Sequence, residues 1–130
     1  MATNKERKNI LVKMADEVIR SSSICKNGII ESESFNGQIA AFSVAVAMSG
    51  LKPAMAIYYD RDNNSSIDKS MIIDLLANMY SKENSFLNKD DFFKEVIYAE
   101  GEKEQSLRNT IIEYAIALKL AIRTFKFKKS

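Results

Sequence analysis

Histidine and tryptophan are absent from the 130 residues, and the chain has one cysteine and one proline. Without histidine, Ser-His and Cys-His nucleophile pairs are excluded, and the commonest general base near neutral pH is missing. The lone Cys25 cannot form an internal disulfide, which favours a reducing compartment, and zinc needs more Cys or His ligands. A glycine-rich phosphate loop is also missing. We therefore expect a protein that is not an enzyme and has no catalytic residues, cofactor or metal site.

The chain is also poor in turn residues, with four glycines and one proline. A β-sandwich or barrel needs more of them, so the composition favours an all-α fold. The longest nearly apolar run, residues 39–48, is too short to span a bilayer. The charged start of the chain does not resemble a signal peptide. We expect a cytoplasmic protein without membrane contact.

Hydrophobic residues at helical spacing predict about six helices in one domain, residues 1–130. The expected helices run from about Asn4 to Ser21, Ser34 to Ser49, Leu51 to Asp60, Ile67 to Ser81, Lys89 to Ala99 and Glu104 to Phe127. Gly50 and Asn88 are expected to cap two of them. Residues 126–130 are expected to fray. The predicted fold class is a single compact all-α bundle.

Two of the predicted helices have apolar surfaces that must be buried against other residues. Residues 39–48 are apolar on every side, which predicts burial by the protein's own fold or by a partner. The last helix has a core stripe at steps of three and four: Leu107, Ile111, Tyr114, Leu118, Ile122 and Phe125. Ile112 and Ile116 lie on another flank, in line with cations. That flank is either a contact surface or is covered by neighbouring helices.

The net charge of +2 conceals an uneven distribution. Residues 1–30 contain six basic and three acidic side chains, residues 31–100 six and eleven, and residues 101–130 seven and three. If the two basic ends meet in the fold, they form one positive face that attracts polyanions. The alternative is that these cations belong to ordinary solvated helix faces.

Residues 60–71 resemble a degenerate calcium loop. Oxygen ligands fall at Asp60, Asp62, Asn64 and Asp68, which are positions one, three, five and nine. Position six is Ser65 instead of glycine, and position twelve is Met71 instead of a bidentate glutamate. We expect a solvated acidic loop and no metal site.

Two stretches match the pattern of one known family. They are residues 34–42, Ser-Phe-Asn-Gly-Gln-Ile-Ala-Ala-Phe, and residues 48–59, Met-Ser-Gly-Leu-Lys-Pro-Ala-Met-Ala-Ile-Tyr-Tyr. Residues 107–125 are similar to that family's closing helix. The chain thereby resembles the small α-helical subunit of the type III-B (Cmr-module) CRISPR–Cas RNA-targeting effector complex. The resemblance implies copies stacked head to tail beside the guide-RNA backbone, which hold target RNA along the guide in antiviral defence and do not cut it.

Such a role needs cations spaced to meet phosphates, without a base-reading code. Lys119 and Arg123 are four residues apart and share a helix face, which Arg108 and Lys126 extend in either direction. On the first helix, Lys13 and Arg20 share a flank. These six residues are the candidate RNA contacts. The implied partners are a guide–target RNA duplex or single-stranded target RNA, other effector subunits and copies of the chain itself. The alternative function is a helical protein–protein adaptor that does not bind RNA.

Overall fold

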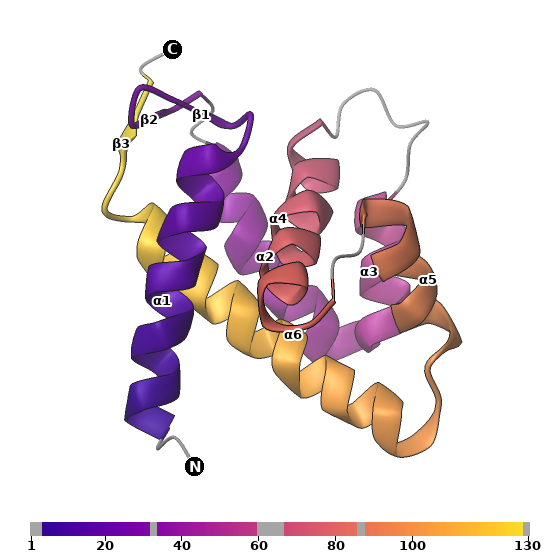
Figure 1. Cartoon of the computed structure of the whole chain (residues 1–130). Coiled ribbons are helices and arrows are strands. Elements are labelled where there is room, and N and C mark those ends of the chain that lie inside the picture. Colours follow the sequence, from indigo (N-terminus) through magenta and orange to yellow (C-terminus); the bar gives the residue numbers. More distant parts are fainter. Residues whose placement is uncertain (1–3, 32–33, 60–66, 86–87, 129–130) are drawn as a thin grey trace.

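The described residues of the computed structural model are 4–31, 34–59, 67–85 and 88–128, with the backbone alone for residues 67–70. They form six α-helices: α1 (Asn4–Ser21), α2 (Ser34–Ser49), α3 (Leu51–Tyr59), α4 (Ile67–Glu83), α5 (Lys89–Tyr98) and α6 (Gly101–Ile122) (Figure 1). The predicted all-α bundle is confirmed. The largest difference is at α6, which ends before Phe127 because Thr124 bonds back to the Ala121 carbonyl through its hydroxyl (2.8 Å) and its amide (3.1 Å).

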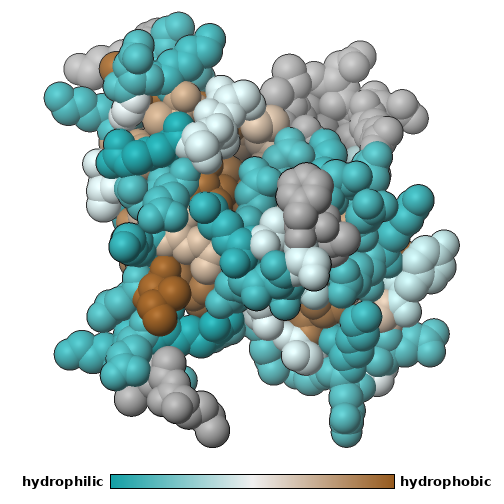
Figure 2. Space-filling view, in the orientation of Figure 1, coloured by the Kyte–Doolittle hydropathy of each residue, from teal (hydrophilic) through white to brown (hydrophobic). Residues whose placement is uncertain are grey.

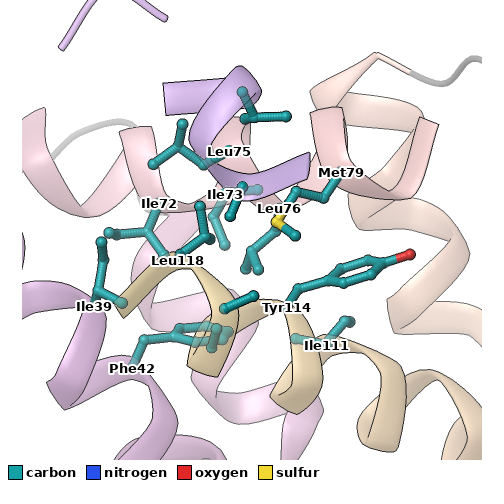
Figure 3. Packing of buried hydrophobic residues seen from close by; sticks show 14 of the residues in the cluster. Ile39, Phe42, Ile72, Ile73, Leu75, Leu76, Met79, Ile111, Tyr114 and Leu118 are labelled. Carbon is teal, nitrogen blue, oxygen red and sulfur yellow. The ribbon is translucent and has the colours of Figure 1, made fainter. Parts of the chain in front are cut away.

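The core lies where α6 crosses α1, α2 and α4. The predicted stripe of α6 is buried along its whole length, from Leu107 to Ile122, and Phe125 beyond the helix end is buried too. Figure 3 shows side chains of three helices meeting there: Ile39 and Phe42 from α2, five residues of α4, and Ile111, Tyr114 and Leu118 from α6. The position of α6 is therefore fixed by packing on its inner side.

Both predicted caps are present. Gly50 ends α2 with φ of 93°, in the left-handed region that favours glycine, and its amide donates to the Val46 carbonyl at 3.0 Å. The Asn88 side chain accepts a hydrogen bond from the Asp91 amide at 2.8 Å and so caps α5.

A small sheet joins residues 25–30 to the C-terminal segment, which the sequence did not lead us to expect. Strands β1 (Cys25–Lys26) and β2 (Ile29–Ile30) form a hairpin around Asn27 and Gly28, whose φ values are 54° and 78°. Positive φ at both central residues is the preferred geometry of a two-residue hairpin loop. Strand β3 (Lys126–Phe127) pairs with β2 in parallel.

The expectation of a frayed tail is therefore wrong for residues 126–128. The Lys128 amide donates to the Ile30 carbonyl at 2.8 Å, and Phe127 packs against the core. Backbone pairing and apolar contact together hold this segment. Residues 129 and 130 lie outside the described residues.

The protein's own fold does not bury α2 on all faces. Gly37, Ala41, Val44 and Met48 form an exposed stripe at steps of four and three, and Met48 is 82% exposed. The reason is that α3, α4 and α6 pack against the other side of α2. The expectation of complete burial now depends on a partner.

One polar cluster ties α1, α4 and α6 together. The Arg7 guanidinium contacts Glu83 of α4 at 3.1 Å and Glu113 of α6 at 3.0 Å. The Tyr114 hydroxyl donates to Glu83 at 2.6 Å. Burial raises the pKa of Glu83, but the hydrogen bonds from Arg7 and Tyr114 and the Arg7 charge outweigh it, so the pKa lies below its usual value.

This cluster predicts a pH-dependent loss of stability. Because the Glu83 pKa is lower in the folded than in the unfolded state, its contribution is present above the unfolded pKa and is lost as pH falls through the folded pKa. We expect Arg7→Met to lower the free energy of unfolding by about 1 kcal/mol at pH 7 and by less at pH 3, which lies below the ordinary pKa of a glutamate. Urea denaturation at both pH values measures this. Lys82→Met, which removes a single ion pair to Glu17 at 3.6 Å, is the control and is expected to change little. An equal loss at both pH values for Arg7→Met would contradict the prediction.

Candidate nucleic-acid interface

The two basic ends of the chain meet in the fold. Arg7 near the start of α1 contacts Glu113, and Arg20 near its end lies over the Phe125 ring, with 4.7 Å from Cζ to the ring centroid. Helix α1 thus runs alongside the second half of α6 and in the same direction (Figure 1). The two basic segments, residues 1–30 and 101–130, therefore come together in the fold, as a shared positive face requires.

The described lysine and arginine side chains fall into two groups. Those with an ion pair to another described residue are Arg7, Arg20, Lys26, Lys52, Lys82, Lys89, Lys103 and Lys128. Those without one are Lys5, Lys8, Lys13, Lys94, Arg108, Lys119, Arg123 and Lys126. All of the second group except Lys94 belong to α1, α6 and the segment that follows α6. We call these seven residues the cationic face.

Five of the six candidate RNA contacts belong to the cationic face. Arg123, Lys126 and Lys13 are exposed, while Arg108 and Lys119 are half-buried; none has an ion pair to a described residue. Lys5 and Lys8 were not among the predicted contacts, although their spacing of three places both on one side of α1.

Arg20 differs from the other candidates. Its Nε donates to Asp16 at 2.8 Å across one helical turn, and this hydrogen bond, with the charge of Asp16, raises the pKa of Arg20. The guanidinium is therefore held over Phe125 and its charge is largely offset. Arg20 marks the point where α1 meets the end of α6, and it contributes less net positive charge than the sequence suggested.

Carboxylates near the cationic face are already occupied. Asp16 pairs with Arg20, Glu17 with Lys82, and Glu113 with Arg7. Three carboxylates of the described residues lack an ion pair or another charged partner. Asp91 lies at the start of α5, and Glu100 and Glu102 lie where α5 is followed by α6. Most of the unpaired cations thus lie away from these carboxylates; Lys94 on α5 and Arg108 on α6 are the exceptions.

An apolar groove runs between α1 and α6 beside these cations. It encloses about 60 Å³ and is lined by Lys8, Leu11, Val12, Glu113, Ile116, Ala117 and Leu120. Ile116 and Leu120 are 46% and 45% exposed, whereas Ile112 packs against the core. The flank whose role the sequence left open is therefore core at Ile112 and surface at Ile116. Figure 2 shows apolar surface over the lower half of α1, where Ile10 is also exposed.

The described residues were also compared with the expectations for a metal site, a reactive cysteine and a membrane-spanning helix. No three Cys, Asp or Glu side chains within it are grouped so that they could hold a metal ion. The ligand positions of the degenerate calcium loop, Asp60 to Asp68, lie outside the described side chains. Cys25 is buried. Among the described helices, none has the length and apolarity needed to cross a membrane.

The Asp16–Arg20 pair gives a direct test of the cationic face. Asp16→Asn leaves Arg20 without its partner, so binding to a single-stranded oligonucleotide should strengthen and its salt dependence should steepen by about 0.7 in the slope of log K against log salt. Fluorescence anisotropy at several salt concentrations measures both. The matched control is Asp74→Asn, which removes the same charge but releases Lys89 on α5, away from the cationic face. Equal gains in the two variants would show that net charge alone matters.

No family model matches the chain, and neither a curated protein nor a solved structure matches it. The proposed function therefore rests on the charges and contacts described above, together with the resemblance at residues 34–42, 48–59 and 107–125.

Proposed function

We propose that this protein is a non-catalytic, RNA-contacting small subunit of a type III-B CRISPR effector complex in the cytoplasm, where it holds target RNA along the guide RNA. The supporting observation is the cationic face, on which seven lysine and arginine side chains lack an ion pair to any described residue while the nearby carboxylates are occupied. Phosphates are the natural partners of such cations.

The geometry of α6 suits contact with a phosphate backbone. Arg108 and Arg123 are fifteen residues apart, which corresponds to about 22 Å along a helix. This row of cations is long enough to meet several successive phosphates of one RNA strand. Cations that contact phosphates give affinity for any sequence, because sequence selection requires side chains that form hydrogen bonds with base edges. Sequence tolerance is what a subunit that follows a variable guide requires.

Head-to-tail stacking in the complex requires two different and complementary surfaces on each copy. The unpaired carboxylates Asp91, Glu100 and Glu102 lie on α5 and at the start of α6, whereas six of the seven residues of the cationic face lie on α1 or beyond the middle of α6. This separation is compatible with stacking and supports the role implied by the resemblance. Partners in this proposal are the guide–target duplex or single-stranded target RNA, other effector subunits and copies of the chain.

One observation favours the second candidate, a protein–protein adaptor that does not bind RNA. Helix α2 contains no charged residue, and its exposed stripe includes Val44 at 56% and Met48 at 82% exposure. An uncharged exposed stripe is typical of protein contact. Both candidates use protein partners, so RNA binding distinguishes them.

Charge reversal on α6 tests RNA binding. We expect Lys119→Glu/Arg123→Glu to weaken binding of single-stranded RNA by at least about tenfold at low salt, and to reduce the salt slope by about 1.4, since two phosphate contacts are lost. The control is Lys52→Glu/Lys103→Glu, which changes the net charge equally but alters cations that are paired with Glu104 and Glu95. Binding by the unmodified protein that does not change with salt would refute the proposal, as would equal losses in both variants.

Purification of the tagged chain from its own cells tests its place in an assembly. We expect a complex that contains small guide RNAs, and the Lys119→Glu/Arg123→Glu variant should retain its protein partners while it holds less target RNA. The guide and target RNAs in the purified complex are identified by extraction and sequencing. A stable complex that contains protein alone would instead favour the adaptor.

A further inference from the structure

The outer side of α2 is a row of exposed residues that no other described element covers. Gly37, Ala41, Val44 and Met48 follow one another at steps of four, three and four, which is the spacing of a seam between two packed helices. We call these four residues the α2 stripe. Large apolar side chains gathered on an exposed helix face mark a contact surface.

The α2 stripe differs from other exposed apolar side chains because its helix is uncharged. Ile116 and Leu120 on α6 lie beside Lys119, whereas α2 contains no lysine, arginine, aspartate or glutamate. A phosphate backbone or a charged peptide would therefore find no charged partner on α2. Two copies of an uncharged surface, in contrast, meet without repulsion between like charges.

Gly37 is an unusual residue at its position in α2. Its φ is not positive, and a Cβ atom added to it would meet no atom within 4 Å. Glycine inside a helix is less favourable than alanine. Neither the backbone conformation nor the packing of the described residues explains this glycine. The absent side chain leaves room beside the helix for a side chain from another molecule.

The side chains of the α2 stripe are ordered by size. The two small residues, Gly37 and Ala41, come first, and the two larger ones, Val44 and Met48, follow. If a second α2 lies antiparallel across the first, with a two-fold axis between residues 41 and 44, Met48 of each copy lies over Gly37 of the other, and Val44 lies over Ala41. Each layer then pairs a small residue with a larger one, which fills the space between two helices.

We propose that α2 of one copy packs antiparallel against α2 of a second copy about a two-fold axis. The contact is isologous, since the same four residues serve both copies. A parallel pair would place Met48 on Met48 and Gly37 on Gly37, which overfills one end and leaves a void at the other. Antiparallel packing also brings the positive N-terminal end of one helix close to the negative C-terminal end of its partner.

This contact goes beyond the proposed function and does not depend on RNA binding, because no residue of the cationic face lies on α2. It also differs from head-to-tail stacking, which uses two different surfaces, whereas a two-fold contact closes on itself. A helix of 16 residues offers less area than the roughly 800 Å² per partner of a standard interface. We therefore expect weak association, with a dissociation constant of about 10 to 100 µM.

Sedimentation velocity of the full chain, from about 10 µM to about 1 mM, tests for this dimer. We expect Gly37→Leu to weaken dimerisation about tenfold, because the leucine and Met48 of the other copy compete for the same space. Met48→Ala in the same chain restores that space, so the double variant should return to within about threefold of the unmodified protein.

Two controls separate the contact from folding and from general stickiness. Gly37→Leu places a better helix former in open space, so it should not lower the thermal stability measured by circular dichroism. Ile10→Ala removes an exposed apolar side chain on α1 and should leave dimerisation unchanged.

Chemical cross-linking measures the orientation of the two helices. Gly37→Cys and Met48→Cys are prepared as separate proteins and treated with a short bis-maleimide, and the native Cys25 is buried. The antiparallel pair predicts a cross-linked dimer only when the two variants are mixed. A parallel pair predicts cross-links within each variant alone.

A chain that stays monomeric at about 1 mM, equally weak dimerisation in Gly37→Leu and the double variant, or cross-links within each single variant would overturn the proposal. If the chain is monomeric and Met48→Lys removes a protein from the complex purified from cells, a different protein covers the α2 stripe and the second copy is refuted. Lys119→Glu/Arg123→Glu should leave dimerisation unchanged. If the dimer forms but RNA binding shows no salt dependence, the RNA function is refuted and this contact stands.

Discussion

The packing of α1 along α6 is the contact on which the proposed interface depends. It joins residues more than a hundred positions apart, as the Arg7–Glu113 bond does, and it is held by apolar side chains on both helices and by the bridge from Arg7 to Glu83 on α4. Two basic segments that are separate in the chain become neighbours because of it. If α1 packed elsewhere, the cations of its first half would not lie beside the basic second half of α6.

Pairing, more than composition, produces the positive face. With a net charge of only +2, the chain has almost as many carboxylates as cations. On α1 and the second half of α6, Asp16, Glu17 and Glu113 are held by arginine or lysine partners, two of them on neighbouring elements. Each such pair contributes little to stability. Its larger effect is on the field outside the molecule, since it removes an acid that would otherwise neutralise a cation of the face.

Most of the helices and caps could be predicted because their signals are local. Apolar spacing and the identities of Gly50 and Asn88 give element type and ends. Strands of two residues have no periodicity, and β3 pairs with a strand almost a hundred residues earlier, so the small sheet could not be predicted. At the candidate interface, helical spacing located most of the cations. The i, i+4 spacing of Asp16 and Arg20 is a local signal that could have shown Arg20 to be paired, but it was missed. The stacking of Tyr59 on Phe93 has no local signal, because the two rings meet only through the packing of α3 on α5.

The hydrophobic core fixes the spacing of the cations on α6. Leu107, Ile111, Tyr114 and Leu118 are buried on the inner side of α6, so the helix backbone is held along the same span that presents Arg108, Lys119 and Arg123. A flexible basic tail would lose conformational entropy on meeting a phosphate backbone, whereas a buried helix has already lost it during folding. Only the side chains remain to be ordered. In the proposed RNA-contacting role, this rigidity would favour affinity without base reading, and the core residues of α6 would contribute to binding as well as to stability.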